Sequence, residues 1–187
     1  MLRKFLLASA CVAGLVAVGP LSAAYAETAP MTEAQQAALN AQISAVEALV
    51  IQYQSDPAGL QAAIQNLVQN ASDPSLAGNA VVSVFNNSTN SQVLAILANN
   101  PGLKDAGGQG LGAAIATIGA TNPDLAAQMT AYVQANGGSN FASSVQSGSD
   151  TQTSSIQQQQ RNNNNNNNNN NDDISNNSTP ETPASPT

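Results

Sequence analysis

The stretch Thr32–Tyr53, TEAQQAALNAQISAVEALVIQY, carries the clearest helical pattern in the sequence. Its large apolar residues follow one another at spacings of four, three, four and three, namely Leu39, Ile43, Val46, Val50 and Tyr53. This spacing places them on one side of an α-helix. Thr32 and Gln35 fit a capping box, in which the hydroxyl and the amide each satisfy a free backbone N–H group. We therefore expect a helix over about residues 33–54, which ends at Asp56-Pro57.

Shorter helices are expected to follow, several with the same kind of start signal. Asp56-Pro57, Asp73-Pro74 and Asn122-Pro123 each combine a side-chain acceptor at the N-cap with a proline at the first helical position. Asn99-Asn100-Pro101-Gly102 and Gly137-Gly138 are typical of helix ends. Apolar residues at helical spacing lie between these signals, in segments 60–68, 76–85, 93–97, 111–118 and 125–133.

This pattern predicts an all-α fold, because spacings of three and four and abundant alanine do not fit alternating β-strands. The predicted helices pair with a loose period, which suits a short α-solenoid of helix pairs. An irregular helical bundle accounts for the same pattern, so both architectures remain open. The glycine-rich run Gly107–Gly112 is expected to be a flexible hinge or a point of close helix packing. A phosphate cradle is less favoured, because neither a Lys nor a Ser/Thr pair follows the run.

The composition changes at about Ser139, where Ser, Gly, Gln and Asn replace most of the apolar residues. A segment with so few large apolar side chains cannot offset an ordering entropy of about 1–2 kcal/mol per residue. We therefore expect a helical domain over 27–138 and a disordered, Asn/Gln-rich C-terminal tail over 139–187. The unbroken Asn162–Asn171 run is either a passive spacer or an element that self-associates through side-chain ladders.

The first 26 residues have the organisation of a cleavable signal peptide. Arg3 and Lys4 precede an apolar segment, 5–18, and Ala24-Tyr25-Ala26 supplies the small-x-small pattern before a cleavage site. The apolar segment is too short to span a hydrocarbon core of about 30 Å. The sequence thus predicts cleavage after Ala26, no transmembrane anchor after cleavage, and an exported protein located in the periplasm, on the cell surface or outside the cell.

The predicted mature chain lacks many chemically useful side chains. It has no cysteine or histidine, and Lys104 and Arg161 are its only basic residues, against eleven acidic ones. Catalysis by a Ser–His or Cys–His pair is therefore excluded, and sites for zinc or copper are not expected. The acidic balance also argues against nucleic-acid partners and against electrostatic binding to anionic lipid. No cofactor and no metal are expected.

Carboxylate pairs are the remaining route to catalysis. The candidates in the predicted helical domain are Glu33, Glu47, Asp56, Asp73 and Asp124. Asp56 and Asp73 are expected to be N-caps, and Glu33 and Asp124 fall in first helical turns, where negative charge is stabilising. A carboxylate-dependent hydrolase is thus the least favoured function, and we expect no catalytic residues.

These observations favour a non-enzymatic structural or interaction protein that binds a protein partner or a second copy of itself through helical apolar surfaces. The candidate interaction face is the stripe formed by Leu39, Ile43, Val46, Val50 and Tyr53. It is expected to pack on the other helices or on a second copy, and any part left exposed would be a binding edge. The alternative is a periplasmic small-ligand or chaperone-like binding protein with a groove between helices.

Overall fold

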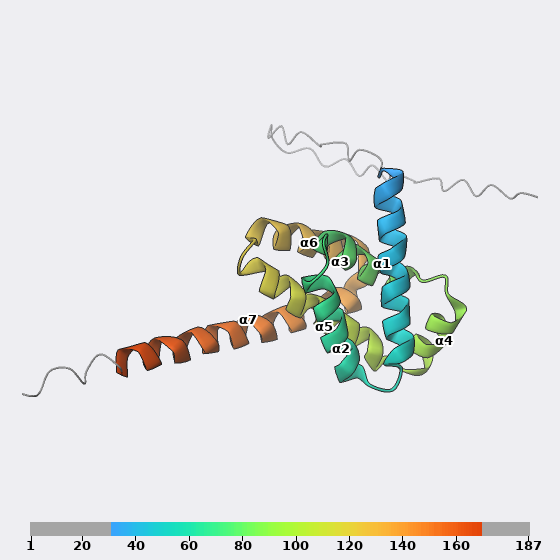
Figure 1. Cartoon of the computed structure of the whole chain (residues 1–187). Helices are drawn as coiled ribbons and strands as arrows, with labels where there is room; N and C mark the ends of the chain where they lie inside the picture. Colours follow the sequence, from blue (N-terminus) through green and yellow to red (C-terminus); the bar gives the residue numbers. More distant parts are fainter. Residues whose placement is uncertain (1–30, 170–187) are drawn as a thin grey trace, which may run out of the picture. The chain divides into compact units, whose positions relative to one another are not determined.

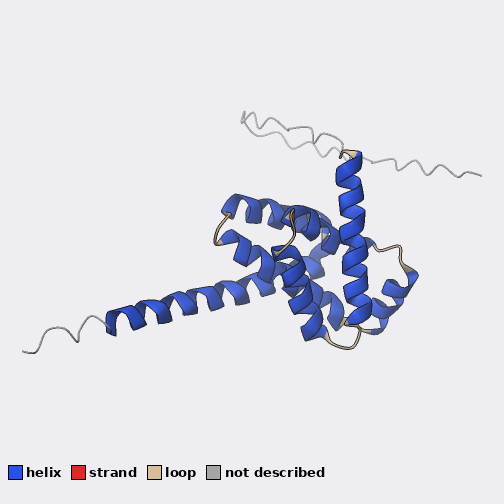
Figure 2. Cartoon of the chain, viewed as in Figure 1, coloured by secondary structure: helices blue, strands red, loops and turns tan. Residues whose placement is uncertain are grey.

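The computed structural model describes residues 31–169, with side chains described up to residue 163, and this range is all-helical (Figures 1 and 2). No strand occurs in it. The helices are α1 (Glu33–Gln52), α2 (Pro57–Gln69), α3 (Pro74–Asn87), α4 (Ser91–Asn99), α5 (Gly102–Gly119), α6 (Pro123–Asn136) and α7 (Gly138–Asn169). None of the helices in this range is long and apolar enough to cross a membrane. The expected signal peptide, 1–26, and the cleavage site after Ala26 lie outside the described residues.

The predicted helix starts are confirmed at the level of single hydrogen bonds. Thr32 forms the capping box of α1 with Gln35. Asp56 and Asp73 accept from the backbone N–H groups of Gly59 at 2.9 Å and Leu76 at 3.0 Å. Asn122 caps α6 in the same way, through Leu125 N at 3.1 Å. Each of these side chains satisfies one backbone donor that the first helical turn leaves free.

The architecture is an irregular bundle around α5 and not a solenoid. In a solenoid each unit contacts only its neighbours along the chain. Here α5 packs most extensively on α7 and on α2, and it also contacts α3 and α6. Helix α1 packs on α3 and also contacts α4 and α2. Helices that are distant in sequence therefore pack together around a single hydrophobic core.

The glycine-rich run lies inside α5, so it is a site of close helix packing and not a hinge. A Cβ atom at Gly107 would overlap the ring of Phe85, and one at Gly108 would lie 2.7 Å from Ser144 Cβ. At Gly110 it would lie 3.1 Å from Ile64 Cβ in α2. The missing side chains thus let α3, α7 and α2 approach the α5 backbone on different sides.

The boundary predicted at residues 138 and 139 is wrong, because the first part of the expected tail belongs to the folded domain. Residues Gly138–Asn169 form α7. Phe141 and Val145, only 1% and 5% exposed, join the core. The Phe141 ring stacks on Phe85 with centroids 5.6 Å apart. Two apolar residues one turn apart, next to small residues, anchor the helix on α5 where composition alone indicated disorder. The remainder of the expected tail, 170–187, lies outside the described residues.

The core contains aliphatic, alanine and phenylalanine side chains and no buried polar or charged residue within the described range. Its largest fully buried members are Phe141, Leu60, Ile64, Leu103, Leu111, Val46, Val50, Val68, Val81, Val82, Val84 and Val93. They come from six of the seven helices in this range. Packing of apolar side chains therefore holds the domain together.

Candidate functional site

A groove of about 460 Å³ lies where α5, α6 and α7 diverge. Helix α5 contributes its C-terminal end, α6 its first two turns and α7 its middle section. The lining residues are Ile115, Ala116, Gly119, Ala120, Ala126, Ala127, Thr130, Ser149, Thr153, Ile156, Gln157 and Gln160. The groove exists because short α5 and α6 side chains leave space beside a helix that continues past them.

The chemistry of this groove is apolar at its base and neutral at its rim. Ile115, Ile156 and the alanines offer apolar contact, whereas Ser149, Thr153 and the two glutamines offer hydroxyl and amide groups. None of the lining residues carries a charge. Such a groove suits an uncharged ligand with apolar and hydrogen-bonding parts, because burying an unpaired charge there would be costly. The sequence did not reveal it, since one wall comes from residues expected to be disordered.

The candidate interaction face on α1 is mostly part of the core. Val46 and Val50 are completely buried, so they offer no surface to a partner. Leu39, Ile43 and Tyr53 are half-buried and pack against the same core. The stripe therefore packs on the other helices, as one of the two predicted alternatives states. Contact of Val46 and Val50 with a partner is therefore excluded in this folded state. Contact of Leu39, Ile43 and Tyr53 with a partner stays a prediction.

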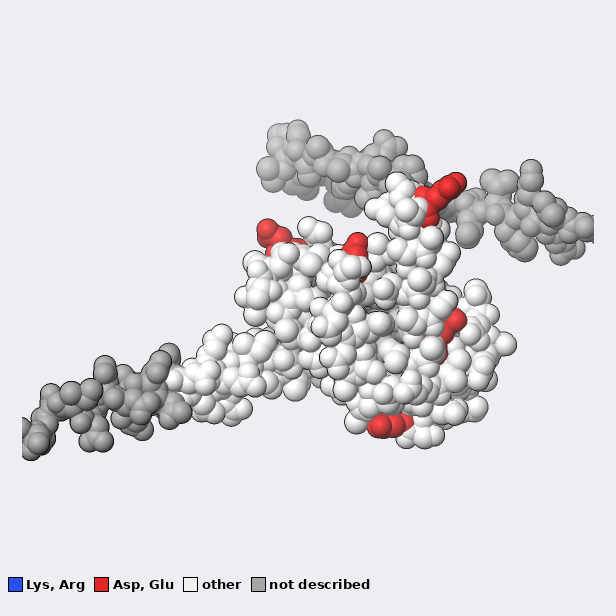
Figure 3. Space-filling model, viewed as in Figure 1, with Lys and Arg blue, Asp and Glu red and all other residues white. Residues whose placement is uncertain are grey.

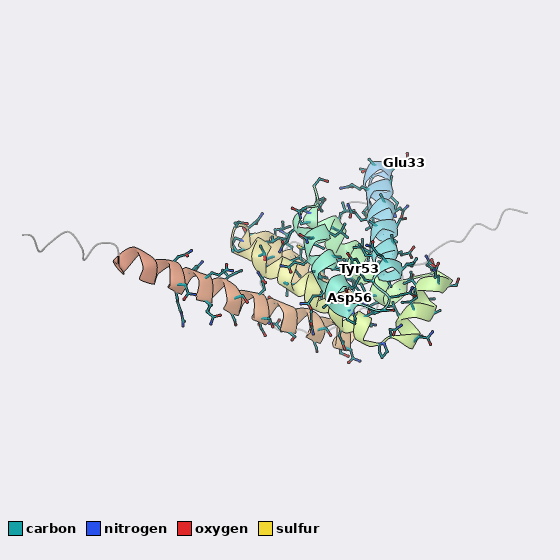
Figure 4. The ribbon with its side chains drawn as sticks, turned by 60° about the horizontal axis from the view of Figure 1, so that its bottom comes forward. Glu33, Tyr53 and Asp56 are labelled. Atoms are coloured by element: carbon teal, nitrogen blue, oxygen red, sulfur yellow. The ribbon has the colours of Figure 1, made fainter. Side chains whose placement is uncertain are left out.

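Tyr53 lies next to Asp56 where the chain passes from α1 into α2 (Figure 4). A Cβ atom at Gly59 would lie 2.7 Å from the Tyr53 ring, so the ring covers the first turn of α2 at this glycine. Glu33 stands at the opposite end of α1 (Figure 4). The side chains from Thr32 to Ala38 are exposed, so the first turns of α1 have little tertiary support.

The candidate carboxylates have separate structural tasks. Asp56 and Asp73 are N-caps, and Glu33 and Asp124 lie in first turns. Glu47 accepts hydrogen bonds from Ser88 Oγ at 3.1 Å and from Asn90 Nδ2 at 3.0 Å, which ties α1 to the α3–α4 connection. Asn90 in turn caps α4, a role that sequence reasoning missed.

The acidic side chains do not gather at the groove. On the face shown in Figure 3 they form separate spots over different helices. None of them lines the groove. Within the described part of the chain, no three Asp or Glu residues lie together in a way that could hold a metal ion. The arrangement gives no pair of carboxylates placed across the groove for acid–base chemistry.

Comparison of the chain with family models, with curated proteins and with solved structures finds no match in any of the three.

Proposed function

We propose that this chain is an exported, non-enzymatic interaction protein in which a helical body presents the long helix α7 to a protein partner. The observation that carries this proposal is the division of α7 into two parts. Phe141 and Val145 fix its first half in the core, whereas every side chain from Gln157 to Asn163 is exposed. Helix α7 has 32 residues and is about 48 Å long at about 1.5 Å per residue.

The exposed half of α7 has little reason to be helical by itself. Most helical stability in proteins comes from packing an apolar face, and asparagine is a poor helix former. The residues Gln157–Asn163 have no large apolar side chain, and all of their side chains are exposed, so such packing is largely missing. Figure 1 shows this part of α7 running away from the other helices. A partner that packs on α7 would supply the missing stabilisation.

Support for export comes from the basic, apolar and Ala24-Tyr25-Ala26 segments at the N-terminus. Fractionation of expressing cells, followed by mass spectrometry of the intact chain, tests this part of the proposal. We expect a chain that begins at Glu27 outside the cytoplasm. A chain that retains Met1 and stays in the cytoplasm would contradict export.

Support for a non-enzymatic role comes from the tasks of the acidic side chains. Caps, helix first turns and the Glu47 hydrogen bonds account for Glu33, Glu47, Asp56, Asp73 and Asp124. The predicted mature sequence has no histidine or cysteine, so it lacks the most common general base and the thiol nucleophile. A role in binding is the simpler account.

The groove favours a second candidate function, the binding of a small uncharged ligand. Its volume of about 460 Å³ falls in the range of ligand pockets, about 300–1,000 Å³. N-phenyl-1-naphthylamine, a neutral apolar dye, is a suitable fluorescent probe. Ala127→Phe fills the groove, whereas Ala135→Phe puts the same side chain two turns further along α6, outside it. This function predicts dye binding that Ala127→Phe abolishes and Ala135→Phe preserves. Equal binding by both variants, or none by the unmodified chain, would exclude it.

A further inference from the structure

A polar stripe with coiled-coil spacing runs along the solvent side of α7. Its members are Ser147, Asp150, Ser154, Gln157 and Arg161, separated by three, four, three and four residues, and all of them are exposed. This is the spacing with which one helix packs along another. The stripe lies roughly opposite Phe141 and Val145 around the helix axis, so a second helix can reach it without displacing α5.

The charges on this stripe are arranged to complement a reversed copy of the same helix. Asp150 and Arg161 are the only charged residues described in α7, and they lie eleven positions apart. Eleven residues make about three turns, so both side chains project from nearly the same side, about 16 Å apart along the axis. An antiparallel copy places the acid of each helix against the base of the other. A parallel copy in register places like charges together.

We propose that α7 pairs antiparallel with α7 of a second copy of this chain, with Asp150 facing Arg161 of the partner subunit and the two-fold axis between Ser155 and Ile156. This inference rests on the proposed function and names the partner that α7 would take. The same register sets Ser154 against Gln157 of the partner subunit. Hydroxyl and amide groups each donate and accept, so a copy of the same surface can satisfy them.

The local surface has room for this pairing. Ser154, Gln157, Gln158 and Arg161 line a shallow hollow of about 240 Å³ on the exposed side of α7. Asp150 accepts one hydrogen bond, from Gln146 Nε2 at 2.8 Å, and a carboxylate has two oxygens that can accept. The serines are small and permit a close approach of the two helices. Because the stripe contains no large apolar side chain, the association is weak, and charge sets its orientation more than its strength.

Charge reversal provides a test with an internal control. Sedimentation equilibrium of the mature chain, up to about 1 mM and at low salt, measures self-association. Arg161→Glu and Asp150→Arg each bring like charges together in the antiparallel pair. The double variant Asp150→Arg/Arg161→Glu restores opposite charges and keeps the net charge of the unmodified chain. Because both positions are exposed, circular dichroism and the melting temperature should show all variants folded.

We expect each single variant to lose about tenfold or more in the association constant. The double variant should recover it, and a mixture of the two single variants should associate more strongly than either alone. Three outcomes would overturn the proposal: a monomer at every concentration, association that the single variants leave unchanged, or a loss that the double variant does not restore. If the chain associated through the asparagine run instead, the single variants would leave the association unchanged. A result that excludes the antiparallel pairing would not bear on export, because cell fractionation tests export separately.

Discussion

Three glycines set how closely α5 and α7 pack. Gly108 and Gly112 in α5 and Gly148 in α7 have no side chain where the backbone of the other helix passes. A Cβ atom at Gly112 would lie 2.8 Å from Ser149 N, closer than real Cβ contacts. Backbone atoms cannot move aside as the end of a flexible side chain can. The buried glycines therefore favour this helix pair even though glycine weakens an isolated helix.

The variant Gly112→Ala tests this role directly. In an exposed helix the change would add about 0.5–1 kcal/mol of stability, but here we expect a loss of about 1–3 kcal/mol from overpacking. Gly102→Ala is the matched control, because nothing lies within 4 Å of its added Cβ atom. Urea denaturation of both variants measures the difference. A Gly112→Ala variant as stable as Gly102→Ala would show that α7 does not pack on α5 at this point.

Val46 belongs to the part of the α1 stripe that lies in the core. Its side chain is 0% exposed within the core. Val46→Asp buries an unpaired carboxylate, so we expect a loss of about 3–5 kcal/mol or a chain that does not fold. Ala48→Asp places the same group on the exposed side of α1 and should change stability by less than about 0.5 kcal/mol. Far-UV circular dichroism during urea titration distinguishes the two variants. Equal stability would show that the α1 stripe is not core.

Sequence predicted the residues with local tasks and missed those with distant partners. Thr32, Asp56, Asp73 and Asn122 act within three residues of their own position, so their capping roles could be read from the chain. Gly112 and Glu47 depend on helices far away in sequence. For them, residue type alone leaves several roles open, and only the packed structure selects one.

At the scale of elements, α7 departs most from expectation. Its mean composition is that of a disordered segment, but stability depends on where the few apolar side chains lie. Phe141 and Val145 occur one turn apart and meet the glycine face of α5, which was itself expected to be either a hinge or a packing site. The packing of α5 on α7 is not recognisable until the two helices are considered together. The groove beside α7 was unpredictable for the same reason.

Truncation at two positions separates the two halves of α7. A chain that ends at Gln160 keeps Phe141 and Val145 in place and should retain its stability to within about 1 kcal/mol. A chain that ends at Gly137 loses both side chains and exposes the α5 surface beneath them. At about 1.5–3 kcal/mol for each buried side chain, we expect a loss of about 3–6 kcal/mol. Thermal denaturation measures both. Equal melting temperatures for the two truncated chains would contradict the anchoring of α7.

At the scale of the whole molecule, the helices could be predicted but not their arrangement. Start signals and apolar spacing gave the helices before residue 138, and the all-α fold is confirmed. The choice between solenoid and bundle depends on contacts such as those of α5 with α2 and α7. Glycines and alanines mediate much of that packing, and such residues give no periodic apolar signal. The interaction role and the export of the chain stay proposals with the tests described above.

Helix α7 is folded into the domain over its first half, and we propose that its second half is presented to a partner. Hydrogen exchange of the mature chain, followed by mass spectrometry of peptides, measures the difference between the two halves of α7. Peptides covering 141–152 should be protected as strongly as those covering 111–115 in α5. Peptides covering 157–163 should exchange faster at concentrations where the chain is monomeric. Rapid exchange over the whole of 139–163 would show that α7 does not pack on α5, because packed backbone amides are protected from exchange.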